Sequence, residues 1–257
     1  MGGSALLALL HLCDSLFPIG AFAYSDGLES AVNARAVRDS DDLRRWLDVC
    51  LDEAIGRCDG PAVLIAWSAF RDQDWESLVA LDEELTAMRP SRTTRMASRS
   101  MGLRLLSTWR ALHPDARLDH ALALARTGAL GPTLPVAFAG ACACVPLVAR
   151  SAPSMSPLDL ARGDPERVEG SKDAGIDARD AVEAFAYTRL AATMSSAMRL
   201  IAIGQNEAHL LLSRALERVP AVVDATIARR AKPESFMPAL DIAQMTHQYV
   251  HSRLFRS

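Results

Sequence analysis

The 257-residue chain is predicted to fold as an all-α protein, a single compact helical domain of about ten helices. Its composition is globular, because half of the residues are hydrophobic and 23% are charged. Ala, Leu, Arg and Met are abundant, and these residues favour helices. Runs of β-branched residues with strand alternation are hard to find. The length allows one domain to bury a substantial core.

Helical periodicity is clear through the first half of the chain. A helix is expected over 41–57, where apolar residues recur at helical spacing opposite charged ones. Asp59 or Gly60 followed by Pro61 indicates the start of a separate helix. The further helices of this half are expected over 62–70, 75–88, 91–112, 118–127 and 134–148.

The second half contains a change of composition. Residues 150–177 are rich in Pro, Gly, Ser, Asp and Arg, which predicts a flexible insertion. After this insertion, Pro220 is expected to separate two helices. Helices are expected over 178–203, 205–217, 221–230 and from 239 to about 253. We therefore expect one domain over 1–257, interrupted by the insertion and ending in a partner-binding tail over 247–257.

Charge and motif content exclude several function classes. The formal net charge is -3, so no basic surplus indicates nucleic-acid binding. The chain contains no GxxxxGK[ST], GxSxG or HExxH motif. We therefore assign no catalytic residue and no cofactor. Five cysteines, an odd number without framework spacing, favour a reducing compartment, and we expect a cytoplasmic protein.

An uncharged stretch raises the question of a membrane. Residues 127–149 carry no charge, and a stretch of that length could span a bilayer. Several Gly and Pro residues interrupt it, and Ala is its main hydrophobe. A buried helix is therefore favoured over the alternative of a membrane-associated helical protein.

Two spacings could bring metal ligands together. His247 and His251 are four positions apart, so on a helix they would share a face and could chelate a divalent ion. A metal-dependent all-α enzyme is therefore the alternative hypothesis, although no third ligand lies nearby in sequence. Cys142 and Cys144 would point about 200° apart on a helix and are expected to be buried as small hydrophobes. We predict no metal site.

The segment DSLFPIGAFAYSDGLES, residues 14–30, joins two expected helices and is unusually apolar for a turn. Pro18 and Gly20 are expected to end the first helix. Asp26 and Glu29, three positions apart, are typical of a capping box that starts the next helix. Four apolar residues of this segment either fill the core or form a docking surface, namely Phe17, Ile19, Phe22 and Tyr24.

Two further regions suggest contacts with a partner. The chain ends in HQYVHSRLFRS, where Leu254 and Phe255 lie between Arg253 and Arg256 and have no obvious core of their own. This segment either folds back on its own domain or is ordered by a partner protein. The arginines over 92–104 either bind a carboxylate or phosphate partner or face solvent.

Four stretches, in order along nearly the whole chain, resemble the UreF family of urease accessory proteins. The first is DSLFPIGAFAYSDGLE and the last is PALDIAQMTHQYVHSRLFRS. The stretch RMASRSMGLRLL is similar to a family pattern at Arg95, Ser98, Gly102, Leu105 and Leu106. The stretch AMRLIAIGQNEAHLLL is similar to another at Ala197, Arg199, Leu200, Gly204 and Gln205.

The resemblance implies a non-enzymatic protein, commonly a homodimer, that binds UreD (also called UreH) and then the GTPase UreG. Such an assembly acts on urease apoprotein and supports nickel delivery and carbamylation of the active-site lysine. We expect neither nucleic acid nor a membrane as a partner. In the family, the C-terminal segment is associated with UreD and the Tyr24 region with the GTPase. The implied partner-binding residues are Pro18, Gly20, Phe22, Tyr24, Ser25, Gly27, Glu29, Arg95, Gly204, Gln205, His247, Arg253, Leu254 and Phe255.

Overall fold

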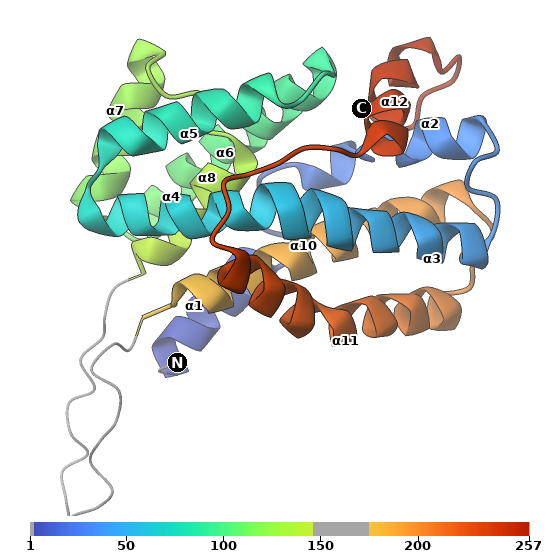
Figure 1. Ribbon diagram of the computed structural model, residues 1–257, viewed down its shortest axis with the longest axis horizontal. Coiled ribbons are helices and arrows are strands. Elements are labelled where there is room, and N and C mark those ends of the chain that lie inside the picture. The colour runs from blue at the N-terminus through green and yellow to red at the C-terminus, as the bar shows by residue number, and fades with distance from the viewer. Residues whose placement is uncertain (1–2, 146–174, 257) are drawn as a thin grey trace, which may run out of the picture.

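Figure 1 shows a computed structural model of the chain, which describes residues 3–145 and 175–256. Every regular element in these ranges is helical, so the expected all-α fold of about ten helices is confirmed. The first range contains α1 (Gly3–Cys13), the 3-10 turn η1 (Ala21–Ala23), α2 (Leu28–Asn33), α3 (Ser40–Val49), the π-helix η2 (Cys50–Asp59), α4 (Gly60–Asp72), α5 (Trp75–Ala87), α6 (Arg92–Leu112), α7 (Ala116–Thr127) and α8 (Leu134–Ala143). The second contains α10 (Ala178–Leu200), α11 (Gln205–Arg229), α12 (Pro238–Thr246) and the 3-10 turn η4 (His247–Tyr249). The expected insertion lies outside the described residues except for its last three positions.

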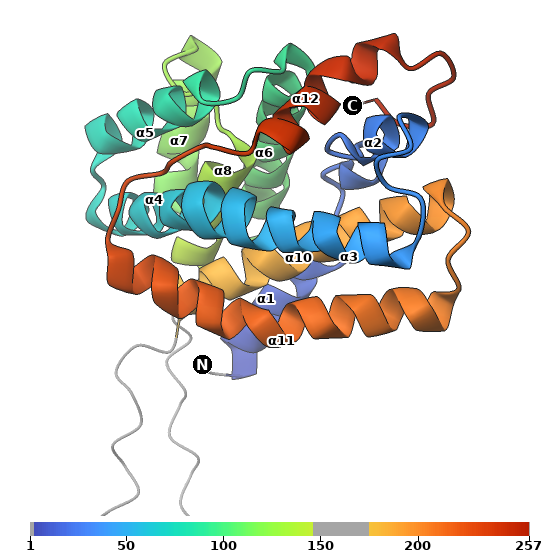
Figure 2. The same ribbon diagram turned by 45° about the vertical axis from the view of Figure 1, so that its right-hand side comes forward.

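Elements α3, η2 and α4 form one continuous helical rod across the molecule (Figures 1 and 2). The expected helix start at Asp59 or Gly60 is confirmed in position, since α4 begins at Gly60, but no break in the backbone separates α4 from the helix before it. Both residues keep right-handed helical dihedral angles, with φ of -73° at Asp59 and -63° at Gly60. The wider π-helical turn continues the rod through Pro61, because the Gly60 N–H donates to the Ile55 carbonyl, five residues earlier.

Carbonyl groups near Pro61 take hydrogen bonds from elsewhere in the fold, because proline has no N–H to donate. The Gly56 carbonyl accepts a hydrogen bond from Thr226 Oγ1 at 2.9 Å. The Arg57 carbonyl accepts one from the Glu234 N–H, also at 2.9 Å. Donors from α11 and the following linker thus stabilise the rod where its own ladder is interrupted.

A second proline also behaves differently from the sequence expectation. Pro220 lies inside α11, which is continuous, and does not divide it into two helices. Pro220 itself is exposed, while Val219 and Val223 beside it are buried. The buried apolar stripe continues on both sides of the proline, so packing against the rod and α10 keeps the whole segment helical.

The last helix is shorter than expected. Its α-helical part ends at Thr246, and only the short turn η4 continues it. His247 therefore lies beyond α12, and His251 lies beyond η4 in irregular backbone. The two histidines do not occupy one face of a helix, which removes the geometric basis of the metal-chelating pair. No group of three His, Cys, Asp or Glu side chains suited to a metal lies within the described ranges.

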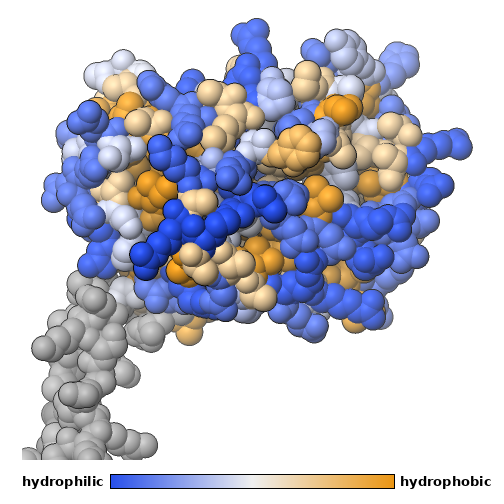
Figure 3. Space-filling model, in the orientation of Figure 1, coloured by the Kyte–Doolittle hydropathy of each residue, from blue (hydrophilic) through white to orange (hydrophobic). Residues whose placement is uncertain are grey.

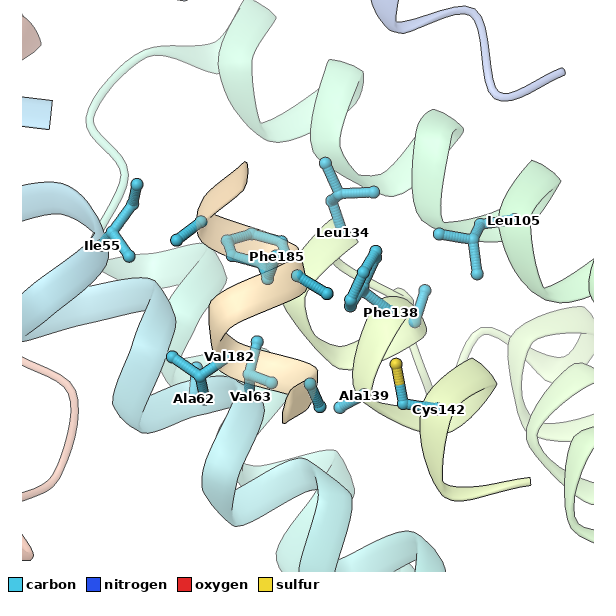
Figure 4. Packing of buried hydrophobic residues seen from close by; sticks show 14 of the residues in the cluster. Ile55, Ala62, Val63, Leu105, Leu134, Phe138, Ala139, Cys142, Val182 and Phe185 are labelled. Atoms are coloured by element: carbon cyan, nitrogen blue, oxygen red, sulfur yellow. The ribbon is translucent and has the colours of Figure 1, made fainter. Parts of the chain in front are cut away.

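The core forms where α8 packs between α4 and α6, with α10 beside it (Figure 4). Helix α8 carries no charge because it is enclosed on all sides, as the uncharged sequence predicted. The rings of Phe138 and Phe185 meet edge to face, with centroids 5.4 Å apart. No described helix is both long and apolar enough to cross a membrane. Cys142 and Cys144 are buried as expected, and burial raises the pKa of the Cys144 thiol to about 12.

Close approach and buried polar groups fix the entry into α8. Gly102 on α6 lies so near the preceding loop that a Cβ would sit 2.0 Å from the Pro132 carbonyl oxygen. The Asp82 carboxylate accepts hydrogen bonds from the backbone N–H groups of Gly131 and Thr133, at 2.9 and 2.8 Å. Burial raises the pKa of Asp82, while these two hydrogen bonds act in the opposite direction.

Candidate functional site

The apolar opening segment and the end of the chain meet on one side of the molecule. Helices α2 and α12 lie side by side, and the C-terminus lies next to them (Figures 1 and 2). We call this region the motif-tail site and define it as residues 17–29 together with residues 247–256. It brings together most of the residues to which the sequence assigned partner contacts.

The Glu29 carboxylate is the centre of the motif-tail site. Its Oε2 atom lies 2.7 Å from His247 Nε2 and accepts a hydrogen bond from the Phe255 N–H at 3.2 Å. Its Oε1 atom accepts one from the Leu254 N–H at 2.5 Å. Glu29 is 5% exposed and His247 is fully buried. A single acidic side chain therefore connects α2 to η4 and to the tail, more than 200 positions away in sequence.

This use of Glu29 replaces the capping box that the sequence suggested. The N-cap of α2 is Gly27, which has no side chain to accept a capping hydrogen bond. Asp26 adopts a left-handed conformation, with φ of 50°, and forms an ion pair with Arg189 of α10. Burial lowers the pKa of Arg189 to about 10, so its charge needs this partner. The Ser25 hydroxyl accepts the Glu29 N–H at 3.4 Å.

Two glycines of the opening segment are required by conformation and by close approach. Gly20 has φ of +77°, and a Cβ there would lie 2.7 Å from the guanidinium atom Nη1 of Arg104. Gly27 has φ of +88°, and a Cβ there would lie 2.9 Å from the backbone nitrogen of Gln244 in α12. Gly27 thus permits the close contact between the start of α2 and α12, which brings the opening segment next to the C-terminal part.

The tail is packed against its own domain. Phe255 is only 4% exposed, and the Arg199 guanidinium lies 4.5 Å from the centre of its ring. The Arg256 N–H donates to the Ala23 carbonyl at 2.8 Å, which ties the tail to the opening segment. Leu254 is 52% exposed, so the two apolar residues of the tail differ in what they present to a partner.

A hollow of about 330 Å³ lies between the opening segment, α6, α10 and the tail. Phe22, which is 75% exposed, and Tyr24 contribute aromatic surface to it. Its lining consists of Gly20, Phe22, Ala23, Tyr24, Arg104, Arg199, Leu254 and Arg256. The sequence did not indicate that Arg199 lines this hollow, although Arg199 belongs to one of the four motif stretches. Arg104 was noted only as part of a basic helix face.

Other predicted residues lie apart from this hollow or only near it. Arg95 donates to the carbonyls of Arg89 and Pro90 and so stabilises the start of α6. Gly204 is the N-cap of α11, and Gln205 is its exposed first residue. Pro18 and Arg253 are exposed parts of the opening segment and the tail, outside the lining of the hollow.

A separate small cavity of about 60 Å³ is lined in part by partly buried charged side chains. Arg89 pairs with Asp59 at 2.5 Å, and the ion pair of Asp26 and Arg189 also borders the cavity. Burial raises the pKa of Asp59, although Arg89 opposes this shift. One pair joins the rod to the linker before α6, and the other joins the opening segment to α10, so both stabilise the arrangement of elements next to the site.

Comparison with known proteins agrees with this arrangement. The sequence profile of the UreF family matches residues 37–155 and 171–216. A urease accessory protein UreF of Methylibium petroleiphilum is 31% identical over all of this chain and 95% of its own length. One from an Arthrobacter species is 31% identical over 99% of this chain and 98% of its own, and one from Ralstonia pickettii is 28% identical.

These relatives are named as accessory proteins of urease and not as enzymes, in agreement with the assignment of this chain as a non-enzyme. The matched profile includes the α4, α6, α8 and α10 core, and the relatives align through the opening segment and the tail as well. The chain therefore belongs to the UreF family of urease accessory proteins.

Proposed function

We propose that this chain is a cytoplasmic, non-enzymatic scaffold for urease maturation. It binds UreD (UreH) and recruits the GTPase UreG, and the assembly supports nickel insertion and lysine carbamylation in urease apoprotein. The observation that carries the proposal is the motif-tail site. Two motif stretches from opposite ends of the chain meet there and leave aromatic and basic groups on the surface.

Exposed apolar side chains on the C-terminal part support a UreD-binding face. Isolated exposed hydrophobes are ordinary, but several on one short segment indicate a protein contact. Figure 3 shows hydrophobic residues among the hydrophilic ones at the upper right, over the region of α12. The exposed apolar residues of this part are Phe236, Ile242, Met245, Tyr249 and Leu254.

The test is co-purification followed by size-exclusion chromatography of the chain with UreD and UreG, with and without GTP. We expect one complex that contains all three proteins. The proposal is wrong if neither partner is retained and a strain without this chain keeps full urease activity. Tyr24→Ala should weaken UreG recruitment by about tenfold and leave UreD bound, because Tyr24 lines the hollow, whereas the exposed apolar residues of α12 do not. Loss of both partners would instead indicate misfolding.

We also propose that a second copy of the chain covers the groove between α1 and α10. This groove has a volume of about 730 Å³ and is lined mainly by apolar and small residues. Leu7, Leu10 and Leu16 are exposed on or beside α1, and Tyr187 is exposed on α10. Such a concentration of exposed leucine on one helix is costly in a monomer and is relieved by self-association.

Light scattering of the purified chain tests the dimer. Leu7→Glu should convert a dimer into a monomer, because a carboxylate would be buried without a partner at the interface. The control is Leu210→Glu, which changes another exposed leucine, on α11, and should leave the mass unchanged. A monomeric parent protein at micromolar concentration would contradict the proposal.

A further inference from the structure

The hollow of the motif-tail site carries a concentration of positive charge. Arg104, Arg199 and Arg256 line it, and the lining contains no Asp or Glu. Within the described residues, none of these three guanidinium groups takes part in an ion pair. Arginines elsewhere contrast with them, because many have an acidic partner. Those partnered arginines are Arg38, Arg44, Arg45, Arg57, Arg89, Arg110, Arg117, Arg179, Arg189 and Arg218.

Contacts with neighbouring groups hold two of these arginines in place. The Arg199 guanidinium lies over the Phe255 ring, and its Nη1 atom donates to the Phe22 carbonyl at 3.4 Å. Arg104 lies against Gly20, where only a glycine leaves space for its guanidinium. Both side chains have thus lost part of their freedom before any ligand arrives, which lowers the entropic cost of binding one.

The rim of the hollow is apolar. Phe22 and Leu254 line the hollow together with the arginines, and they are 75% and 52% exposed. A free phosphate or bicarbonate ion would pair with the guanidinium groups and leave this apolar rim uncovered. A protein segment with an acidic side chain between apolar neighbours would satisfy both parts. The volume is at the lower end of the range for ligand pockets and suits one side chain with its neighbours.

We infer that this hollow is an anion site for a single carboxylate side chain on an acidic, partly apolar segment of a partner protein. The planar guanidinium groups of Arg104 and Arg199 can donate paired hydrogen bonds to such a carboxylate. Phe22 and Leu254 pack against the residues next to it. The inference rests on the proposed function only in that a partner protein docks on this side of the molecule.

A direct test uses the isolated full chain and does not require any accessory protein. The chain is titrated with the peptide acetyl-Leu-Glu-Phe-amide, and the side-chain Nε–H resonances of its arginines are followed by NMR. We expect saturable shifts at Arg104 and Arg199. The matched peptide acetyl-Leu-Gln-Phe-amide should bind at least about tenfold more weakly, since it lacks the charge. Arg92, exposed on the same helix and outside the hollow, should not respond.

Three outcomes would overturn the inference. One is equal binding of the Glu and Gln peptides, and another is an equal response of Arg92. The third is a response to sodium phosphate as strong as the response to the Glu peptide, which would define a site for free anions instead. Arg104→Gln should abolish the difference between the two peptides, whereas Arg92→Gln should preserve it. Circular dichroism spectra must show that both variants are folded.

The same variants separate this inference from the proposed function. If the parent chain forms the complex with UreD and UreG but Arg104→Gln forms it equally well and the peptide does not bind, the anion site is wrong and the scaffold stands. If the peptide binds as described but the parent chain retains neither accessory protein, the anion site stands and the proposed function is wrong.

Discussion

The core around α8 and the motif-tail site differ in how they are held together. Helix α8 is buried on every side by apolar residues from α4, α6 and α10 (Figure 4). Many weak van der Waals contacts together stabilise α8, and no single contact contributes most of the stability. In the motif-tail site, one carboxylate accepts hydrogen bonds from two segments that lie far from it in sequence, η4 and the tail. The core therefore tolerates the loss of most single contacts, whereas the site depends on Glu29.

The two regions also differ in what glycine does. In the core, Gly102 lets α6 approach a loop backbone closely. In the motif-tail site, Gly20 and Gly27 have positive φ and also make room for Arg104 and for α12. Gly102 is therefore required only for close packing, whereas Gly20 and Gly27 also allow the backbone to take a left-handed conformation. Changes in the core should thus lower global stability, and changes in the site should release the tail.

The largest expected effect is in the core. Gly102→Ala places a methyl group against the Pro132 carbonyl oxygen, and neither α6 nor the entry to α8 can move away without losing contacts. We expect a loss of about 3 kcal/mol in the free energy of unfolding, measured by urea denaturation. Gly204→Ala is the control, because a Cβ there meets nothing within 4 Å. Equal stability of the two variants would show that the approach of α6 is not tight.

The second prediction concerns the site. Glu29→Gln removes the charge and leaves one oxygen to serve three donors, so the Leu254 and Phe255 amides lose a strong acceptor. We expect hydrogen exchange of these two amides to accelerate by at least about tenfold, with a loss of about 2 kcal/mol in global stability. Glu217→Gln, an exposed change on α11, should alter neither quantity. Unchanged exchange at both amides would contradict the role of Glu29.

The smallest expected effect is a pH dependence of the free energy of unfolding that comes from His113, at the end of α6. His113 packs on Trp109, with ring centroids 4.2 Å apart, and burial and His11 lower its pKa below the ordinary value of 6.5. The folded state then binds this proton less tightly than the unfolded state. The associated stability is complete above pH 6.5 and is lost as the pH falls below it.

Denaturant unfolding at several pH values between about 7 and 5 measures this contribution. His113→Gln should flatten the pH dependence of the free energy of unfolding in that range. The effect should be small, because His113 is only partly buried and lies at the end of α6. If the free energy of unfolding of the variant changes with pH as steeply as that of the parent, the pH dependence comes from other groups.

The fold was largely predictable from the sequence, and the exceptions have a common cause. Pro61 and Pro220 were expected to separate helices, which is their usual local effect. At Pro61, hydrogen bonds to the Gly56 and Arg57 carbonyls come from Thr226 and the Glu234 backbone, residues far along the chain. At Pro220, burial of the flanking valines keeps the segment helical. Local rules were overridden by contacts that only the folded chain makes.

The site was predictable in its residues but not in their roles. The opening segment and the tail were both predicted to bind a partner because they contain more apolar side chains than a turn or a terminus usually has. Nothing in the spacing of Asp26 and Glu29 indicated that one pairs with Arg189 and the other with the tail. The pairing of Phe255 with Arg199 was equally hidden, since the two residues lie on separate elements.

The sequence by itself determined the all-α class, the positions of most helices and the burial of α8, because periodicity and charge patterns are properties of neighbouring residues. It also identified the UreF family through four ordered motif stretches. The tertiary structure alone decided that Glu29 holds the tail, that the two prolines are tolerated and that three arginines share one hollow. The partners of a buried charge or an orphaned carbonyl are chosen by the fold, and sequence spacing carries no record of them.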